Sequence, residues 1–266
     1  MIFKLSKYVA VILLIMSAGI TYADNITIWD EDGYTAGGQG GEDNETEPGM
    51  IQNPFWDLES FDLVGNELGI TASFNLKDGY KYDGHKYTLG DIFIDVDPTV
   101  DAAQFGTIML PGGHCRDLDP TRLNYGYEYA IRLTYGIDQN GNEEMNYNVY
   151  TLNDNSLFID VLESGNQPAS NPYRLDLDAG NNEVIKTSGT FTYTSGFTYT
   201  SGFHNSVSGI DLSFIGSTEF IAHATMDCGN DNLMGRGSIS VPEPSIIGLL
   251  GIGLLSLIGF RKKNRR

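Results

Sequence analysis

Alternation of apolar and polar residues is the feature of this sequence that most restricts its fold. At 127–135, every odd position is Tyr, Ile or Leu, and Glu, Ala, Arg and Thr stand between them. A period of two is the period of a β-strand. No stretch shows helical spacing, and similar alternating runs occur at 68–76, 91–97, 105–110, 146–152, 157–162, 207–215, 219–226 and 235–241. Together with abundant Gly, Asn and Asp, these runs predict an all-β fold, an antiparallel β-sandwich of jelly-roll type.

Two local sequences predict hairpins. Val64-Gly65-Asn66-Glu67 has the form of a two-residue turn that joins a strand at 56–64 to the next strand. A tandem copy at 191–202 repeats Phe-Thr-Tyr-Thr-Ser-Gly, and the six-residue period keeps aromatics on one strand face and threonines on the other. We interpret the copy as a duplication that lengthens one hairpin. A threonine face that binds ordered water or sugar is the alternative.

The first 23 residues have the parts of a secretory signal peptide. Lys4 and Lys7 precede an apolar stretch at 8–16, and small residues follow, ending in Thr21-Tyr22-Ala23. This order of charge, apolar run and small-residue site is typical of exported proteins. We expect a signal helix at 1–23, use of the Sec translocon, cleavage after Ala23, and an exported β domain at 24–240.

The C-terminal segment has three parts in a characteristic order. An apolar run at 246–260 and a basic cluster at 261–266 follow the box Val241, Pro242, Glu243 and Pro244. Fifteen residues rise about 22 Å as a helix, against a hydrocarbon core of about 30 Å, so 246–260 predicts a short transmembrane helix. The basic cluster places its far end on the cytoplasmic side.

Segment 241–266 resembles the PEP-CTERM sorting tail of Gram-negative bacteria. The resemblance implies that a membrane protease-transpeptidase, exosortase, cuts near the Pro-Glu-Pro box and releases the protein outward. It therefore implies an inner-membrane anchor before processing, and a cell-surface or extracellular location afterwards. An ordinary C-terminal anchor is the alternative.

The body of the chain, which lies between the signal peptide and the tail, has a charge that restricts its binding partners. The whole chain has 16 basic and 35 acidic residues, a net charge of −19. Without the two lysines of the signal, and without the five basic residues and Glu243 of the tail, nine basic and 34 acidic residues remain, a net charge near −25. Such a body repels nucleic acid and anionic lipid. It attracts divalent cations, or it is simply the solvated surface of a secreted protein.

One acidic cluster has the composition of a calcium site. Asp91, Asp95 and Asp97 fall on one face of the expected strand at 91–97, and Asp101 follows shortly. Ca²⁺ takes six to eight oxygen ligands in flexible geometry, so these four carboxylates are candidate calcium ligands. Solvated or ion-paired carboxylates are the alternative.

The chain has two cysteines, Cys115 and Cys228. In an exported protein, an even pair favours a disulfide. A catalytic thiol is the alternative, because His114 adjoins Cys115, but strand neighbours point to opposite faces and His114 is badly placed as its base.

Further resemblances concern the body. Residues 42–49, 56–61, 90–95 and 225–231 resemble segments of uncharacterised exported PEP-CTERM proteins, a similarity that brings no activity. The strand at 90–95 is also similar to one in carbohydrate-binding modules of family nine. Since the common catalytic motifs are lacking, we expect a non-catalytic structural or adhesive protein of the exopolysaccharide layer. A secreted carbohydrate-binding module is the first alternative, and a glycan hydrolase that uses two of the many carboxylates is the second.

Overall fold

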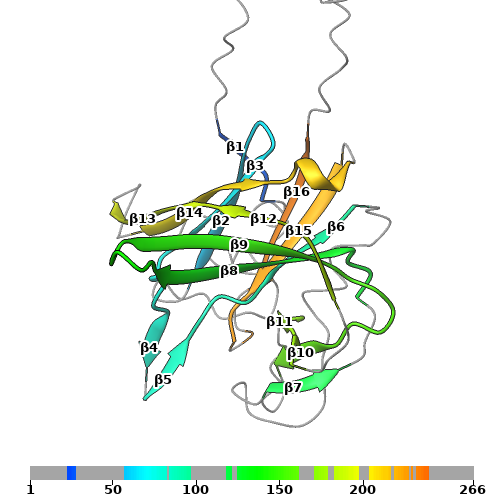
Figure 1. Ribbon diagram of the computed structural model, residues 1–266, viewed down its shortest axis with the longest axis horizontal. Helices are drawn as coiled ribbons and strands as arrows, with labels where there is room; N and C mark the ends of the chain where they lie inside the picture. The colour runs from blue at the N-terminus through cyan, green and yellow to red at the C-terminus, as the bar shows by residue number, and fades with distance from the viewer. Residues whose placement is uncertain are drawn as a thin grey trace, which may run out of the picture.

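The computed structural model describes eleven parts of the chain, and the description below is limited to them: residues 23–27, 57–82, 84–96, 118–121, 125–161, 171–178, 183–197, 204–216, 219–227, 229 and 232–239. Within these parts the chain forms antiparallel β-sheets, and the one helical element is a 3₁₀ turn, η3 (Ser213–Ile215). The prediction of an all-β fold is confirmed (Figure 1). None of the helices among the described residues is long and apolar enough to cross a membrane. The predicted signal helix and the predicted helix at 246–260 lie outside the described residues.

Two large antiparallel sheets make up most of the described structure. A five-stranded sheet has the order β1 (Asp24–Asn25), β2 (Leu58–Val64), β3 (Glu67–Ala72), β14 (His204–Asp211) and β13 (Thr192–Phe197). A six-stranded sheet has the order β12 (Val184–Thr190), β9 (Glu143–Thr151), β8 (Tyr129–Ile137), β6 (Ile92–Asp95), β15 (Glu219–Thr225) and β16 (Asn232–Ser238). Two smaller sheets accompany them, one of β11 (Arg174–Leu175), β10 (Phe158–Val161) and β7 (Leu118–Thr121), the other of β4 (Tyr80–Tyr82) and β5 (His85–Tyr87).

The two large sheets share one hydrophobic core. The five-stranded sheet contributes side chains such as Phe61 and Ile70, and the six-stranded sheet contributes Ile94, Val149 and Phe220. Each such aliphatic or aromatic side chain stabilises the fold by about 1.5–3 kcal/mol when it is fully buried. This core therefore joins the two sheets into one unit.

The six-stranded sheet is also covered on its other face. A second cluster contains Phe93 of β6, Ile221 of β15 and Tyr127, which lies just before β8. These side chains pack with Phe158 and Leu175 of the three-stranded sheet. All four residues of β6 are consequently buried. A strand covered on both faces is expected to be apolar almost throughout, as Ile92-Phe93-Ile94 is.

Chain segments pass from one large sheet to the other at both lateral edges. At one edge, β12 pairs with β9 and the next strand, β13, pairs with β14, with the buried Phe191 between them. At the other edge, β1 pairs with β2, and then Thr27 forms a bridge with Gly235 of β16. The carbonyl of Ile26 accepts a hydrogen bond from the Arg236 amide at 2.8 Å. Both transitions hold the two sheets together along their sides.

The predicted hairpin at Gly65-Asn66 is confirmed. β2 and β3 pair with Val64 opposite Glu67, and Gly65 has a φ of +63°, which glycine adopts without a steric penalty. In the tandem copy, Phe191 points inward while Thr192 and Thr194 are exposed, as predicted for the first repeat. Most of the second repeat lies outside the described residues.

Two predicted strands are too long, and one of them, expected at 68–76, ends at Ala72. The strand expected at 207–215 ends at Asp211, because the Asp211 carboxylate accepts a hydrogen bond from the Ser213 amide at 2.8 Å and turns the chain into η3. Gly216 then ends η3 with a φ of +62°. The strand expected at 105–110 lies outside the described residues.

Candidate functional site

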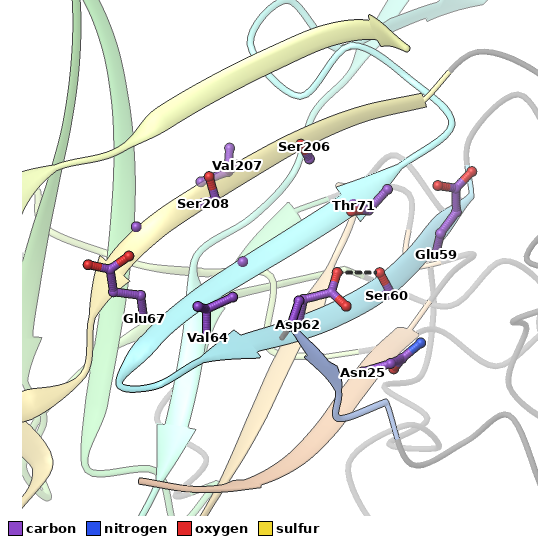
Figure 2. A pocket seen from close by; sticks show the side chains of 13 residues that line it. Asn25, Glu59, Ser60, Asp62, Val64, Glu67, Thr71, Ser206, Val207 and Ser208 are labelled. Atoms are coloured by element: carbon purple, nitrogen blue, oxygen red, sulfur yellow. Dashed lines mark hydrogen bonds between the residues drawn. The ribbon is translucent and has the colours of Figure 1, made fainter. Parts of the chain in front are cut away.

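A groove lies on the outer face of the five-stranded sheet (Figure 2). Its volume is about 480 Å³, and residues of β1, β2, β3 and β14 line it. Most of the side chains in it are small and polar, including the hydroxyls of Ser60, Thr71, Ser206 and Ser208. Its volume falls within the range of roughly 300–1,000 Å³ that is typical of ligand sites.

Two glycines keep this face hollow. Gly69 lies in the middle of β3, where an added Cβ would come within 3.0 Å of the carbonyl oxygen of Val207. Gly209 lies in β14 at an irregularity of register and has a φ of +89°. Neither residue places a side chain over the sheet, so the groove is open between its polar walls.

Three carboxylates line the groove. Figure 2 shows Glu59 and Glu67 at opposite ends of the groove and Asp62 between them. The Ser60 hydroxyl donates a hydrogen bond to Asp62 Oδ2 at 2.9 Å. Among the described residues that line the groove there is no lysine, arginine or histidine, although Glu59 contacts His204 beside it. The carboxylates of Asp62 and Glu67 therefore favour cationic groups.

Glu59 lies at an irregularity in the pairing of β2 with β3, and this irregularity determines where its side chain points. The register between β2 and β3 shifts between Leu58 and Ser60, so Glu59 is the extra residue of a β-bulge. Its Oε1 lies 2.5 Å from His204 Nδ1, and both side chains are almost completely buried. The bulge therefore directs a carboxylate from a position next to the groove into a contact with β14.

The structure places Asp91, a predicted calcium ligand, in a buried ion pair. Arg132 of β8 donates to Asp91 Oδ1 through Nε at 2.8 Å and to Oδ2 through Nη2 at 2.7 Å. The amide of Leu175 also donates to Asp91 Oδ2, and Arg132 Nη2 donates to the Leu175 carbonyl. Burial by itself lowers the pKa of Arg132, but the hydrogen bonds and charge of Asp91 outweigh it, so that this pKa is raised. Asp91 thus joins the six-stranded sheet to the three-stranded sheet.

Asp95 lies on the same strand face as Asp91 and is also buried. Desolvation, with the nearby charge of Asp95 as a second cause, raises the pKa of Tyr127 well above its ordinary value. Asp97 and Asp101 lie outside the described residues. Among the residues that are described, no group of three or more His, Cys, Asp or Glu is placed to hold a metal ion. Calcium binding by the full set of four stays a prediction.

A second polar cluster ties β5 to the turn after β15. His85 Nε2 lies 3.2 Å from Asp227 Oδ2, and the Thr88 amide donates to Asp227 Oδ1 at 3.2 Å. Desolvation raises the pKa of Asp227, although hydrogen bonds from Thr88 and His85 oppose the shift. The Thr88 hydroxyl lies 2.7 Å from the hydroxyl of Tyr173. Sequence reasoning missed this cluster, because its members come from distant segments and follow no motif.

The remaining predicted site residues lie elsewhere in the chain. Cys115 and Cys228, and the box Val241, Pro242, Glu243 and Pro244, are outside the described residues. The disulfide therefore stays a prediction. The groove residues could not be identified from the sequence, except that alternation along 56–64 and 68–76 predicted which side chains share a face.

Comparison with known proteins identifies the end of the chain. The family model described as the PEP-CTERM protein-sorting motif matches residues 240–266. No curated protein and no solved structure matches the chain. The resemblances of the body to uncharacterised exported proteins and to carbohydrate-binding modules accordingly stay untested. Directly after the last described strand, the chain carries a PEP-CTERM sorting motif, which implies an exported protein that an exosortase sorts.

Proposed function

We propose that this protein is a non-catalytic component of the cell surface or extracellular polymer matrix, with a structural or adhesive role among exopolysaccharide chains. The sorting motif at 240–266 is the observation that carries this proposal, since it implies export and exosortase as processing partner. The acidic composition of the body supports it, because self-repulsion keeps such a surface soluble and separate from anionic lipid.

We interpret the two large sheets as a β-sandwich. Their shared core and the two segments that pass between them at the lateral edges support this interpretation. Sandwiches expose broad, rigid sheet faces, and the groove lies on such a face. A rigid exposed face suits adhesion to an extended polymer, because few side chains lose freedom on binding.

The proposed export route begins at the signal peptide. Cleavage after Ala23 by the secretory machinery gives Asp24 as the first residue, and Asp24 is also the first residue of β1. Asp24 pairs with Leu63 and Asn25 with Asp62, so a protein cleaved there keeps its complete first strand. The segment at 246–260 then anchors the body at the inner membrane until exosortase removes it.

The contacts of two groove carboxylates support a non-catalytic role. Glu59 contacts His204, and Asp62 accepts a hydrogen bond from Ser60. Glycoside cleavage needs one protonated and one ionised carboxyl group on opposite sides of a bond, about 5–9 Å apart. A glycan hydrolase is therefore the weaker candidate, and a soluble carbohydrate-binding module is the nearer alternative.

The proposal is tested by processing and by binding. Mass spectrometry of the exported protein is expected to show Asp24 at the start and loss of the segment beyond the Pro-Glu-Pro box. An exported protein that retains Arg266 contradicts exosortase sorting. The exported protein is also expected to sediment with purified exopolysaccharide without releasing reducing ends. Release of reducing ends that disappears in a groove carboxylate variant supports the hydrolase instead.

A further inference from the structure

We propose that the groove on the five-stranded sheet binds glycan chains that carry free amino groups, such as segments of glucosamine residues. This inference rests on the proposed role among exopolysaccharides, and it names the chemical class of polymer that the protein holds. The groove is the site, and the ammonium groups of the sugar are the recognised feature.

The charge of the groove selects for cations. Asp62 and Glu67 line its floor and one end, and no basic side chain is among the described residues that line it. Cleavage after Ala23 adds one ammonium group, on Asp24, so these two carboxylates still outnumber the positive charge there. An ammonium group that hydrogen-bonds to a carboxylate gains more than a neutral hydroxyl does. Uronate, sulfate and phosphate groups are repelled by the same carboxylates, so anionic glycans are excluded unless a cation bridges them.

The hydroxyl groups of the groove suit a sugar. Ser60, Thr71, Ser206 and Ser208 come from three neighbouring strands and line a volume of about 480 Å³. Each hydroxyl both donates and accepts, as sugar hydroxyls do. The described part of the lining contains no aromatic side chain on which a neutral sugar ring stacks, so affinity is expected to depend on the charged groups.

A basic peptide is the competing ligand, and the geometry favours it less. Peptides add to sheets at free edges, but β1 already pairs with β2 at this edge of the sheet. Peptide grooves on sheet or helix faces also need apolar pockets, and among the described lining residues Val64 is the large apolar side chain that is exposed. The face therefore offers polar contacts along a shallow hollow, which suits a hydroxylated polymer.

The test uses the full chain in neutral detergent and titration calorimetry with defined oligomers of equal length. Glucosamine oligomers are expected to bind at low salt, and fully N-acetylated oligomers to bind at least about tenfold more weakly, since acetylation removes the charge. Added salt is expected to weaken the binding of glucosamine oligomers.

Matched variants locate the site. The double change Asp62→Asn with Glu67→Gln removes two negative charges from the groove and keeps side-chain shape. The control Glu144→Gln with Asp154→Asn removes two from exposed positions on β9 and the loop after it, outside the groove. We expect the groove variant to lose glucosamine binding by at least about tenfold and the control to keep it within about twofold. Ser208→Tyr fills the exposed end of the groove while keeping every carboxylate, and it is expected to weaken binding as well.

Three results overturn the inference: equal binding of amino and N-acetylated oligomers, equal loss in the groove and control variants, or a lysine-rich peptide that binds more tightly with the same sensitivity to the groove variants. Circular dichroism on each variant confirms that it is folded. If the protein still sediments with native exopolysaccharide in any of these cases, the proposed matrix role stands and only the assignment of the groove fails.

Discussion

The buried pair of Asp91 and Arg132 provides a quantitative test of how the layers of this protein are held together. Asp91 is 1% exposed, and three hydrogen bonds reach its carboxylate. The Arg132 side chain is 20% exposed and also donates to the Leu175 carbonyl. Each partner thus depends on the other for neutralisation in a region that water scarcely reaches.

Removing one partner leaves the other charge buried, which costs about 3–5 kcal/mol in comparable pairs. Asp91→Asn keeps an oxygen for one donor and leaves an arginine that has some access to water, so we expect about 3 kcal/mol of lost stability. Arg132→Met leaves the more deeply buried carboxylate with the Leu175 amide as its remaining donor. We expect a larger loss, about 4–5 kcal/mol.

The double variant Asp91→Leu with Arg132→Met separates pairing from packing. Apolar replacement of a buried pair is often close to neutral, although here the amide and carbonyl of Leu175 lose their partners, at about 1–3 kcal/mol each. The matching single variants are Asp91→Leu, which like Asp91→Asn leaves the arginine charge unpaired, and Arg132→Met. We therefore expect the double variant to be less destabilised than the sum of these two. Such non-additivity is the signature of a direct interaction.

Urea unfolding followed by circular dichroism measures these differences. A loss of 3 kcal/mol in a body of this size lowers Tm by roughly 6–12 °C. Additive effects, or a loss below about 1 kcal/mol for Asp91→Asn, refute the assignment of Asp91 to a structural pair. Repeating the series with calcium and with chelator is the control: a loss that appears only when calcium is present assigns Asp91 to a metal site instead.

Three further outcomes are expected. Gly90→Ala places a methyl group 1.9 Å from the carbonyl oxygen of Tyr173, so thermal unfolding should show a loss of at least about 3 kcal/mol, while no loss contradicts the contact. Burial raises the folded-state pKa of Asp227, so the folded protein favours the protonated carboxyl group. The stability that this group contributes is therefore present at acid pH and lost as the pH rises through the folded-state pKa. Asp227→Asn should flatten that part of the profile of stability against pH. Titration of unreduced, unfolded protein should find no free thiol if Cys115 and Cys228 form the predicted disulfide, and two reactive thiols exclude it.

The sequence alone determined the class of fold and the sorting motif at 240–266. Alternation is a local property, since successive side chains of a strand point to opposite faces wherever the strand lies. That is why most strands of the two large sheets and the Gly65-Asn66 turn were predictable within a few residues, whereas β12 was missed. The sorting motif is local as well, because its box, apolar run and basic cluster are adjacent in the chain.

The tertiary structure decided what each strand face meets. Asp91 and Asp95 share a strand face, as predicted, but the three-stranded sheet covers that face, and Arg132 from another strand neutralises Asp91. Likewise, the groove depends on a register shift next to Glu59 and on the close approach of Gly69 to the carbonyl oxygen of Val207. Pairing between segments that are distant in the sequence produces these features, and a pattern with a period of two does not encode which sheet lies opposite.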